Sequence, residues 1–97
     1  MHAMIGVFKI DSGLLARQRQ ELDERIVPLV RHQPGFVSAT WSYDRDTGRS
    51  YALVVLDSER ATRKLAAFVQ EQSASPNDAG VELESIIVAE VLAEVGR

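Results

Sequence analysis

The chain contains no cysteine, which excludes disulfide bonds, thiolate nucleophiles and cysteine-ligated metal sites. It also has no apolar run near the roughly 20 residues that span a membrane. Its first residues lack the basic start and long apolar core of a signal peptide. From these absences we expect a cytoplasmic protein that makes no contact with a membrane.

An excess of basic residues is missing as well. The formal net charge is −3, whereas nucleic-acid-binding domains usually carry a basic patch. The arginines between residues 17 and 31 alternate with acidic residues, which is typical of a solvated helix face. We therefore expect no nucleic acid among the partners.

Motifs for metals, phosphates and nucleophilic catalysis are not found in the sequence. The two histidines, His2 and His32, lie far apart, and His32 is better explained as a favourable charge at a helix C-terminus. Asp44 and Asp46 resemble a short metal loop, but both are ordinary turn formers. We expect no metal and no cofactor, and no catalytic residue is assigned.

What the sequence does contain is enough for one small domain, residues 1–97. Its 97 residues are 45% hydrophobic and 26% charged, as in ordinary globular proteins. A core of this size is small, so association with a second chain would add stability.

A β-hairpin is the most strongly patterned part of the chain. Two runs rich in β-branched and aromatic residues, 36–43 and 49–56, flank a turn-forming segment, 44–48. Gly48 supplies the positive φ that such a loop needs at its end. A five-residue loop predicts the opposed pairs Trp41–Tyr51, Ala39–Leu53 and Val37–Val55.

This pairing divides the hairpin into two faces. The bulkier face, which we assign to the helix side, carries Val37, Ala39, Trp41, Tyr43, Tyr51, Leu53 and Val55. The other carries Phe36, Ser38, Thr40, Ser42, Ser50, Ala52, Val54 and Leu56. Because Phe36, Val54 and Leu56 would form an exposed apolar surface there, we expect a second copy of the chain to cover it with two-fold symmetry.

The remaining segments complete the order of elements. We predict a strand over 4–10, in which Gly6 marks a bulge or a close approach, and a helix over 13–32 that is kinked or broken at Pro28. A second helix, capped by Ser58, is predicted over 59–72, with a loop over 73–80.

The tail, 81–95, alternates apolar and polar residues, which favours a long strand over a helix. Such a strand would span ~50 Å. We expect its far end to pair with, or lie across, another subunit.

This order predicts an α+β fold of the ferredoxin-like βαββαβ type, a four-stranded antiparallel sheet with two helices on one face. Four features carry a resemblance to a known family: Pro34-Gly35-Phe36 after the long helix, the hairpin tip 44–48, the Ser58-capped helix and the long last strand. In these features nearly the whole chain resembles the dimeric α+β barrel superfamily. It is most similar to the antibiotic-biosynthesis-monooxygenase-like branch.

That resemblance implies a homodimer and leaves the activity open. Haem-degrading members rely on a histidine in the second helix, and residues 59–72 contain none. Oxygenating members use Asn, Trp, Tyr or Arg groups in the cleft between sheet and helices, and the one Asn of this chain, Asn77, falls in the predicted loop.

Trp41, Tyr43 and Tyr51 are the candidate ligand-binding residues, as the wall of a pocket for a flat apolar molecule. The alternative is that these aromatics simply fill a small core.

Three functions remain open from the sequence. The first is a small homodimeric protein that binds an apolar or aromatic molecule in a cleft between sheet and helices. The second, implied by the resemblance, is a cofactor-independent monooxygenase in which the protein positions the substrate and stabilises an anion. The third is an accessory domain that joins other proteins through the last strand.

Overall fold

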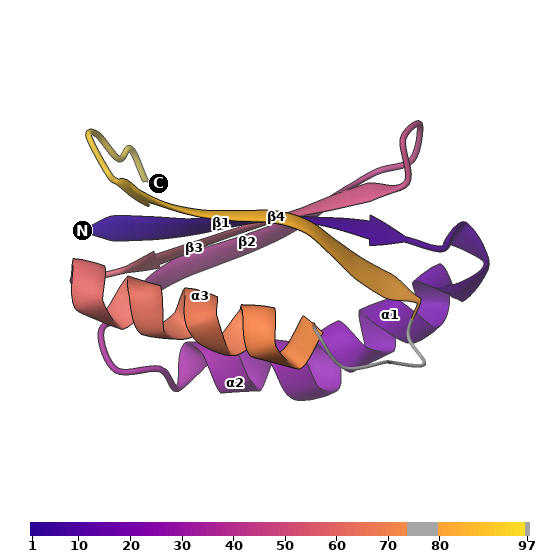
Figure 1. Ribbon diagram of the computed structural model, residues 1–97, viewed down its shortest axis with the longest axis horizontal. Helices are drawn as coiled ribbons and strands as arrows, with labels where there is room; N and C mark the ends of the chain where they lie inside the picture. Colours follow the sequence, from indigo (N-terminus) through magenta and orange to yellow (C-terminus); the bar gives the residue numbers. More distant parts are fainter. Residues whose placement is uncertain (74–79, 97) are drawn as a thin grey trace.

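The computed structural model describes residues 1–73 and 80–96. A single sheet is covered on one side by two helical segments that lie side by side (Figure 1). The elements are β1 (His2–Ile10), η1 (Ser12–Leu14), α1 (Leu15–Glu21), η2 (Leu22–Ile26), α2 (Val27–Arg31), β2 (Phe36–Asp44), β3 (Arg49–Leu56), α3 (Glu59–Ser73) and β4 (Val81–Glu90). Most of the predicted loop 73–80, including Asn77, lies outside the described residues.

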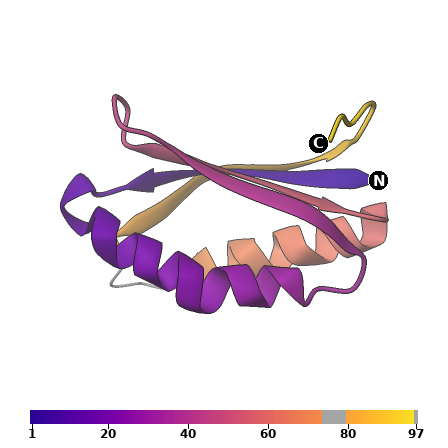
Figure 2. The same ribbon diagram turned by 180° about the vertical axis from the view of Figure 1, so that it is seen from behind.

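The sheet confirms the predicted fold. Its strand order is β2-β3-β1-β4 and all neighbours are antiparallel. Figure 2 shows from behind that the other side of the sheet carries no helix. No helix among the described residues is both long enough and apolar enough to cross a membrane.

The hairpin register differs from the predicted one by one residue. Asp44 pairs with Arg49, so the loop has four residues instead of five, and Trp41 lies opposite Ala52 instead of Tyr51. The turn allows this because the Gly48 N–H donates to the Asp44 carbonyl at 2.9 Å, and Gly48 has a φ of 73°. The Asp44 side chain also accepts from the Asp46 N–H at 2.9 Å.

A one-residue slip moves every side chain of one strand to the other face, and here that strand is β3. Tyr51 and Leu53 lie on the uncovered face, whereas Val54 and Leu56 lie under the helices, where both are fully buried. A bulge between Phe36 and Ser38 places Phe36 beside Leu56. The prediction that Phe36, Val54 and Leu56 form the uncovered face was therefore wrong.

The predicted irregularity at Pro28 takes the form of a π turn, η2, in the turn before it. The Val27 N–H donates to the Leu22 carbonyl, five residues back. Proline has no N–H, and its ring crowds the carbonyl four residues earlier. A wider turn accommodates both effects without ending the helix.

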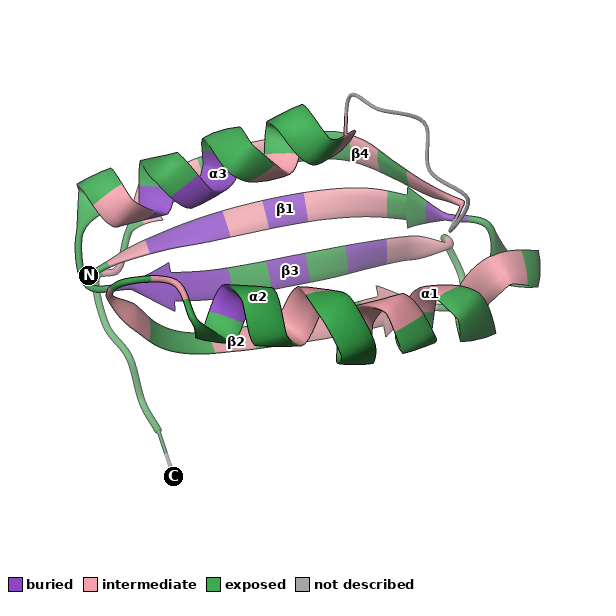
Figure 3. Ribbon diagram, turned by 90° about the horizontal axis from the view of Figure 1, so that it is seen from below, coloured by how far each residue is buried: buried purple, intermediate pink, exposed green. Residues whose placement is uncertain are grey.

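The last strand is shorter than predicted. β4 ends at Glu90, and the Val91 N–H donates to the Met1 carbonyl at 3.0 Å. Because β1 begins at His2, residues 92–96 run past the end of their neighbouring strand. They extend away from the body (Figure 3), and Leu92 and Val95 are 91% and 96% exposed.

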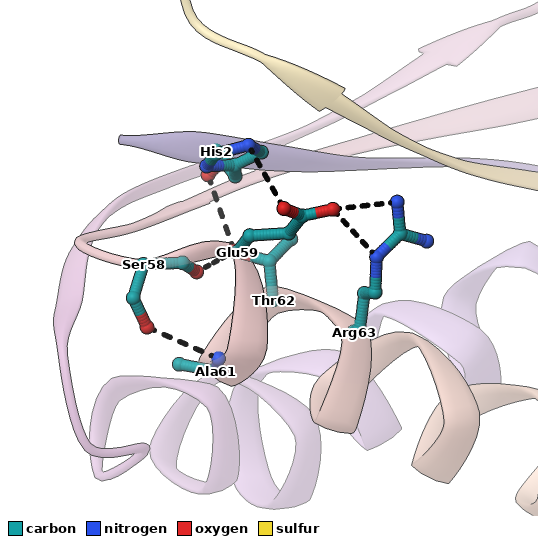
Figure 4. A network of polar contacts seen from close by, with 6 residues as sticks. All are labelled: His2, Ser58, Glu59, Ala61, Thr62 and Arg63. Atoms are coloured by element: carbon teal, nitrogen blue, oxygen red, sulfur yellow. Dashed lines mark hydrogen bonds and ion pairs between the residues drawn. The ribbon is translucent and has the colours of Figure 1, made fainter.

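Helix α3 closes the core over β1, β3 and β4. Ser58 caps it as predicted, because its Oγ accepts from the Ala61 N–H at 3.1 Å. The buried Thr62 hydroxyl lies 2.8 Å from the Ser58 carbonyl and 3.4 Å from the His2 carbonyl of β1. Figure 4 shows this contact beside Glu59, which accepts from Arg63 at 2.8 Å.

Candidate ligand-binding site

A cavity of about 510 Å³ lies between the sheet and the two helical segments that cover it, α1–α2 and α3. Its apolar lining comes from all four strands and from both helical segments: Met4, Phe8, Ile10, Leu22, Ile26, Leu29, Val30, Trp41, Ala52, Val54, Leu65, Phe68, Val69 and Val81. Its polar lining is Arg17, Gln18, Glu21, Arg25, Ser50, Gln72 and Ser73. This volume is in the range of small-molecule sites.

Three aromatic residues from three different elements line the cavity: Trp41 from β2, Phe8 from β1 and Phe68 from α3. Only Trp41 was predicted. Gly6, which the sequence marked as a bulge or a close approach, points to Phe8. The Phe8 ring lies over this glycine, because a Cβ added to Gly6 would lie 2.9 Å from Phe8 Cε2. A register shift of the β1–β4 pairing between Val7 and Phe8 accompanies this close approach.

The two predicted tyrosines lie elsewhere. Tyr43 lies two residues after Trp41 on the same face of β2, but it does not line the cavity. Tyr51 lies on the opposite face of the sheet and is 39% exposed. The shared aromatic face predicted for Trp41, Tyr43 and Tyr51 is therefore not formed. The one-residue difference in loop length accounts for Tyr51.

The long helix, which runs without a break from α1 through η2 to α2, forms the roof of the cavity. Neither α1 nor η2 contains a buried residue, and α2 contains only Val30. Arg17 and Arg25 line the cavity but are exposed, and Glu21 between them is half-buried, so the three lie at one edge of this roof. The Arg25 Nε–H donates to Glu21. The roof is therefore apolar toward the interior and charged along one edge.

The cavity offers little acid–base chemistry. Glu21 is the one carboxylate among its described lining residues, and none of these residues is a histidine. His32 lies at the end of α2, with Nδ1 at 2.6 Å from the Pro28 carbonyl. No group of three potential metal ligands is found within residues 1–73 and 80–96. What the arrangement provides is an apolar enclosure with one polar edge.

The sheet order and the helices on one face define the class of fold, which is ferredoxin-like α+β. The haem degrader MhuD from Mycobacterium tuberculosis, solved with two haems in its active site, superposes with a TM-score of 0.75 at 16% identity, over 99% of this chain and 100% of that one.

Two further solved structures share the fold. A candidate antibiotic biosynthesis monooxygenase from Deinococcus radiodurans gives a TM-score of 0.74 at 20% identity, over 100% and 98% of the two chains. The monooxygenase ActVA-Orf6 of Streptomyces coelicolor, bound to nanaomycin D, gives 0.63 at 17%, over 99% and 92%. No family model and no curated protein matches the sequence.

Proposed function

We propose that this protein binds a small apolar or aromatic molecule in the cavity between sheet and helices. The observation that carries the proposal is the 510 Å³ cavity with Trp41, Phe8 and Phe68 in its lining. Aromatic walls hold flat ligands by stacking and by burial of apolar area. Neighbours of the same fold that carry haem or nanaomycin D support a ligand of this kind.

The only tryptophan of the chain lies in this lining and therefore reports on occupancy. N-phenyl-1-naphthylamine, a neutral aromatic probe, is expected to quench Trp41 and to fluoresce by energy transfer from it. Ala52→Leu, which fills the cavity from its floor, should abolish the transfer. Ala67→Leu makes the same change at an exposed position of α3 outside the cavity lining and should leave the transfer intact. Equal transfer in both variants would contradict binding in the cavity.

We also propose that the protein is a homodimer formed through the uncovered face of the sheet. Tyr51, Leu53 and Ile87 are 39%, 43% and 55% exposed, and register places all three on this face. An apolar surface across the middle of a sheet is usually covered. The exposed Leu92 and Val95 of the tail extend from the edge strand β4, a position from which they would reach the second copy.

Sedimentation tests this arrangement. Leu53→Glu places a charge in the middle of the uncovered face and should convert the dimer to monomer at micromolar concentration. Arg60→Glu changes the charge of an exposed position on α3 and should leave the dimer intact. A wild-type protein that sediments as a monomer at this concentration would refute the homodimer. Deletion of residues 91–97 should weaken the dimer less than Leu53→Glu does.

A cofactor-independent monooxygenase is the second candidate, favoured by the fold likeness to ActVA-Orf6. In such a reaction the protein orients an electron-rich substrate and stabilises its anion. The test is oxygen consumption with a dihydroxynaphthalene, compared between wild type and Ala52→Leu. Equal rates in the two proteins would assign any consumption to the uncatalysed reaction. The cytoplasmic location expected from the sequence stays a prediction.

Haem degradation is not proposed, although MhuD superposes well. Helix α3 contains no histidine, and the two histidines of the chain are His2 and His32. Neither of them lines the cavity.

A further inference from the structure

Ser50 is the one buried polar residue among the described residues that line the cavity. It is 8% exposed, whereas the other polar lining residues are at least partly exposed. Within residues 1–73 and 80–96, no group forms a hydrogen bond with the Ser50 Oγ. A hydroxyl without a partner in apolar surroundings costs free energy. Ser50 therefore offers a hydrogen bond that no described part of the chain takes up.

The Ser50 Oγ is open toward the cavity. In the part of the chain that the structure describes, the one fully enclosed polar side-chain atom without a partner is His2 Nδ1. The Ser50 Oγ is not enclosed in this way, and Ser50 lines the cavity from its floor, strand β3. An atom of a bound ligand can therefore reach this hydroxyl.

Two aromatic residues flank Ser50 on the helix side of the sheet. Ser50 pairs with Phe8 of β1 and with Tyr43 of β2. The Phe8 ring lies over Gly6, and Gly6 pairs with Ala52, the next residue of β3 on this face. Because Gly6 has no side chain, the ring can lie toward Ala52, and Ser50 stays in contact with the cavity.

Building on the proposed function, we infer that Ser50 orients the ligand through a hydrogen bond between its Oγ and an uncharged hydroxyl or carbonyl oxygen of the ligand. The aromatic body of the ligand lies over Ala52, which pairs with Trp41 on one side and with Gly6, under the Phe8 ring, on the other. The oxygen is uncharged, because the aromatic neighbours of Ser50 supply no counter-charge and a buried ion without one is costly.

Two ligands of nearly the same shape test this contact. 2-Naphthol carries a hydroxyl where 2-methylnaphthalene carries a methyl group. Displacement of bound N-phenyl-1-naphthylamine gives the affinity of each ligand. The ratio of the two affinities is compared between proteins, so that the different hydration of the free ligands cancels. Ser50→Ala should lower the preference for 2-naphthol about five-fold, as expected for the loss of one uncharged hydrogen bond.

Two further variants assign the effect to the hydroxyl. Ser50→Cys nearly keeps the shape of the side chain but replaces the hydroxyl by a weakly hydrogen-bonding thiol, so it should lower the preference as well. Ser38→Ala makes the serine-to-alanine change at an exposed position of β2 outside the cavity lining and should leave the preference unchanged. All three variants should stay folded, which thermal unfolding checks.

The outcomes separate this inference from the proposed function. The same preference in wild type, Ser50→Ala and Ser50→Cys would overturn the role of Ser50 and leave the apolar site in place. A preference that Ser38→Ala lowers as much as Ser50→Ala does would overturn this role too. Absence of energy transfer from Trp41 to N-phenyl-1-naphthylamine would overturn the proposed function and this inference with it.

Discussion

The two halves of the helix-covered side of the sheet are built differently. The first half of α3 packs on the sheet, where Thr62, Leu65 and Ala66 are buried, and its second half borders the cavity. Under the long helix the cavity holds helix and sheet apart, and of the helix residues only Val30 is buried. Figure 3 shows this difference in burial between α3 and the long helix. One half is closely packed, and the other leaves most of the cavity open.

Side-chain chemistry explains the difference. Helix α3 presents small residues, Ala61 and Ala66, on either side of Leu65, so its backbone can approach the sheet closely. The long helix presents Arg17, Gln18 and other long polar side chains toward the same sheet face. Burial of the polar ends of such long side chains costs free energy, so their half of the interface stays open.

The largest expected effect is on the packed half. Leu65→Ala removes a side chain that is 1% exposed and should lower the free energy of unfolding by about 2–5 kcal/mol. Leu29→Ala makes the same change on the roof, where the side chain is 40% exposed, and should cost less than about 1 kcal/mol. Urea unfolding measures both. Similar losses would mean that the roof is packed as tightly as α3.

A smaller effect is expected at the π turn. Pro28→Ala restores an N–H donor, so a regular helix can form through residues 22–27, and stability should rise by about 1 kcal/mol. Pro34→Ala, beyond the helix, is the matched control and should leave the stability of this helix unchanged. Urea unfolding measures both variants, and a Pro28→Ala protein no more stable than wild type would show that the π turn carries no cost.

The smallest effect is on the outer surface of α3. The hydrogen bond from Arg63, then its charge, lower the pKa of Glu59 below its ordinary value of 4.5. A carboxyl whose pKa is lower in the folded state stabilises the fold above its unfolded pKa, and this stabilisation is lost as pH falls through the folded value. Arg63→Gln should thus be slightly less stable than wild type at pH 7 and equal to it near pH 3.

The difference between the two proteins should also shrink in high salt, because both groups are exposed. Arg60→Gln, at an exposed position of the same helix, is the control and should follow the wild-type pH curve. A difference that persists at pH 3 would rule out the Glu59 pair as its cause.

The order of strands and helices was predictable because each element carries its own pattern. The hairpin runs, the Ser58 cap and the irregularity near Pro28 all depend on residues close in sequence. The end of β4 was not predictable in this way, because it depends on where β1 begins.

The cavity lining was less predictable than the fold. The pattern of the hairpin placed Trp41 on the helix side, but Phe8 and Phe68 reach the cavity from elements distant in sequence. Tyr51 was placed on the wrong face because four-residue and five-residue loops are both compatible with the segment 44–48. In the four-residue loop, the Gly48 N–H at the tip of the hairpin donates to the Asp44 carbonyl.

By itself the sequence determined the βαββαβ order, the helix-side position of Trp41 and the lack of cysteine chemistry, since these depend on local periodicity and composition. Only the tertiary structure decided the hairpin register, the length of the last strand and the hollow under the long helix. Those features arise from contacts between elements, where one residue of slip or one wider turn changes which side chains meet.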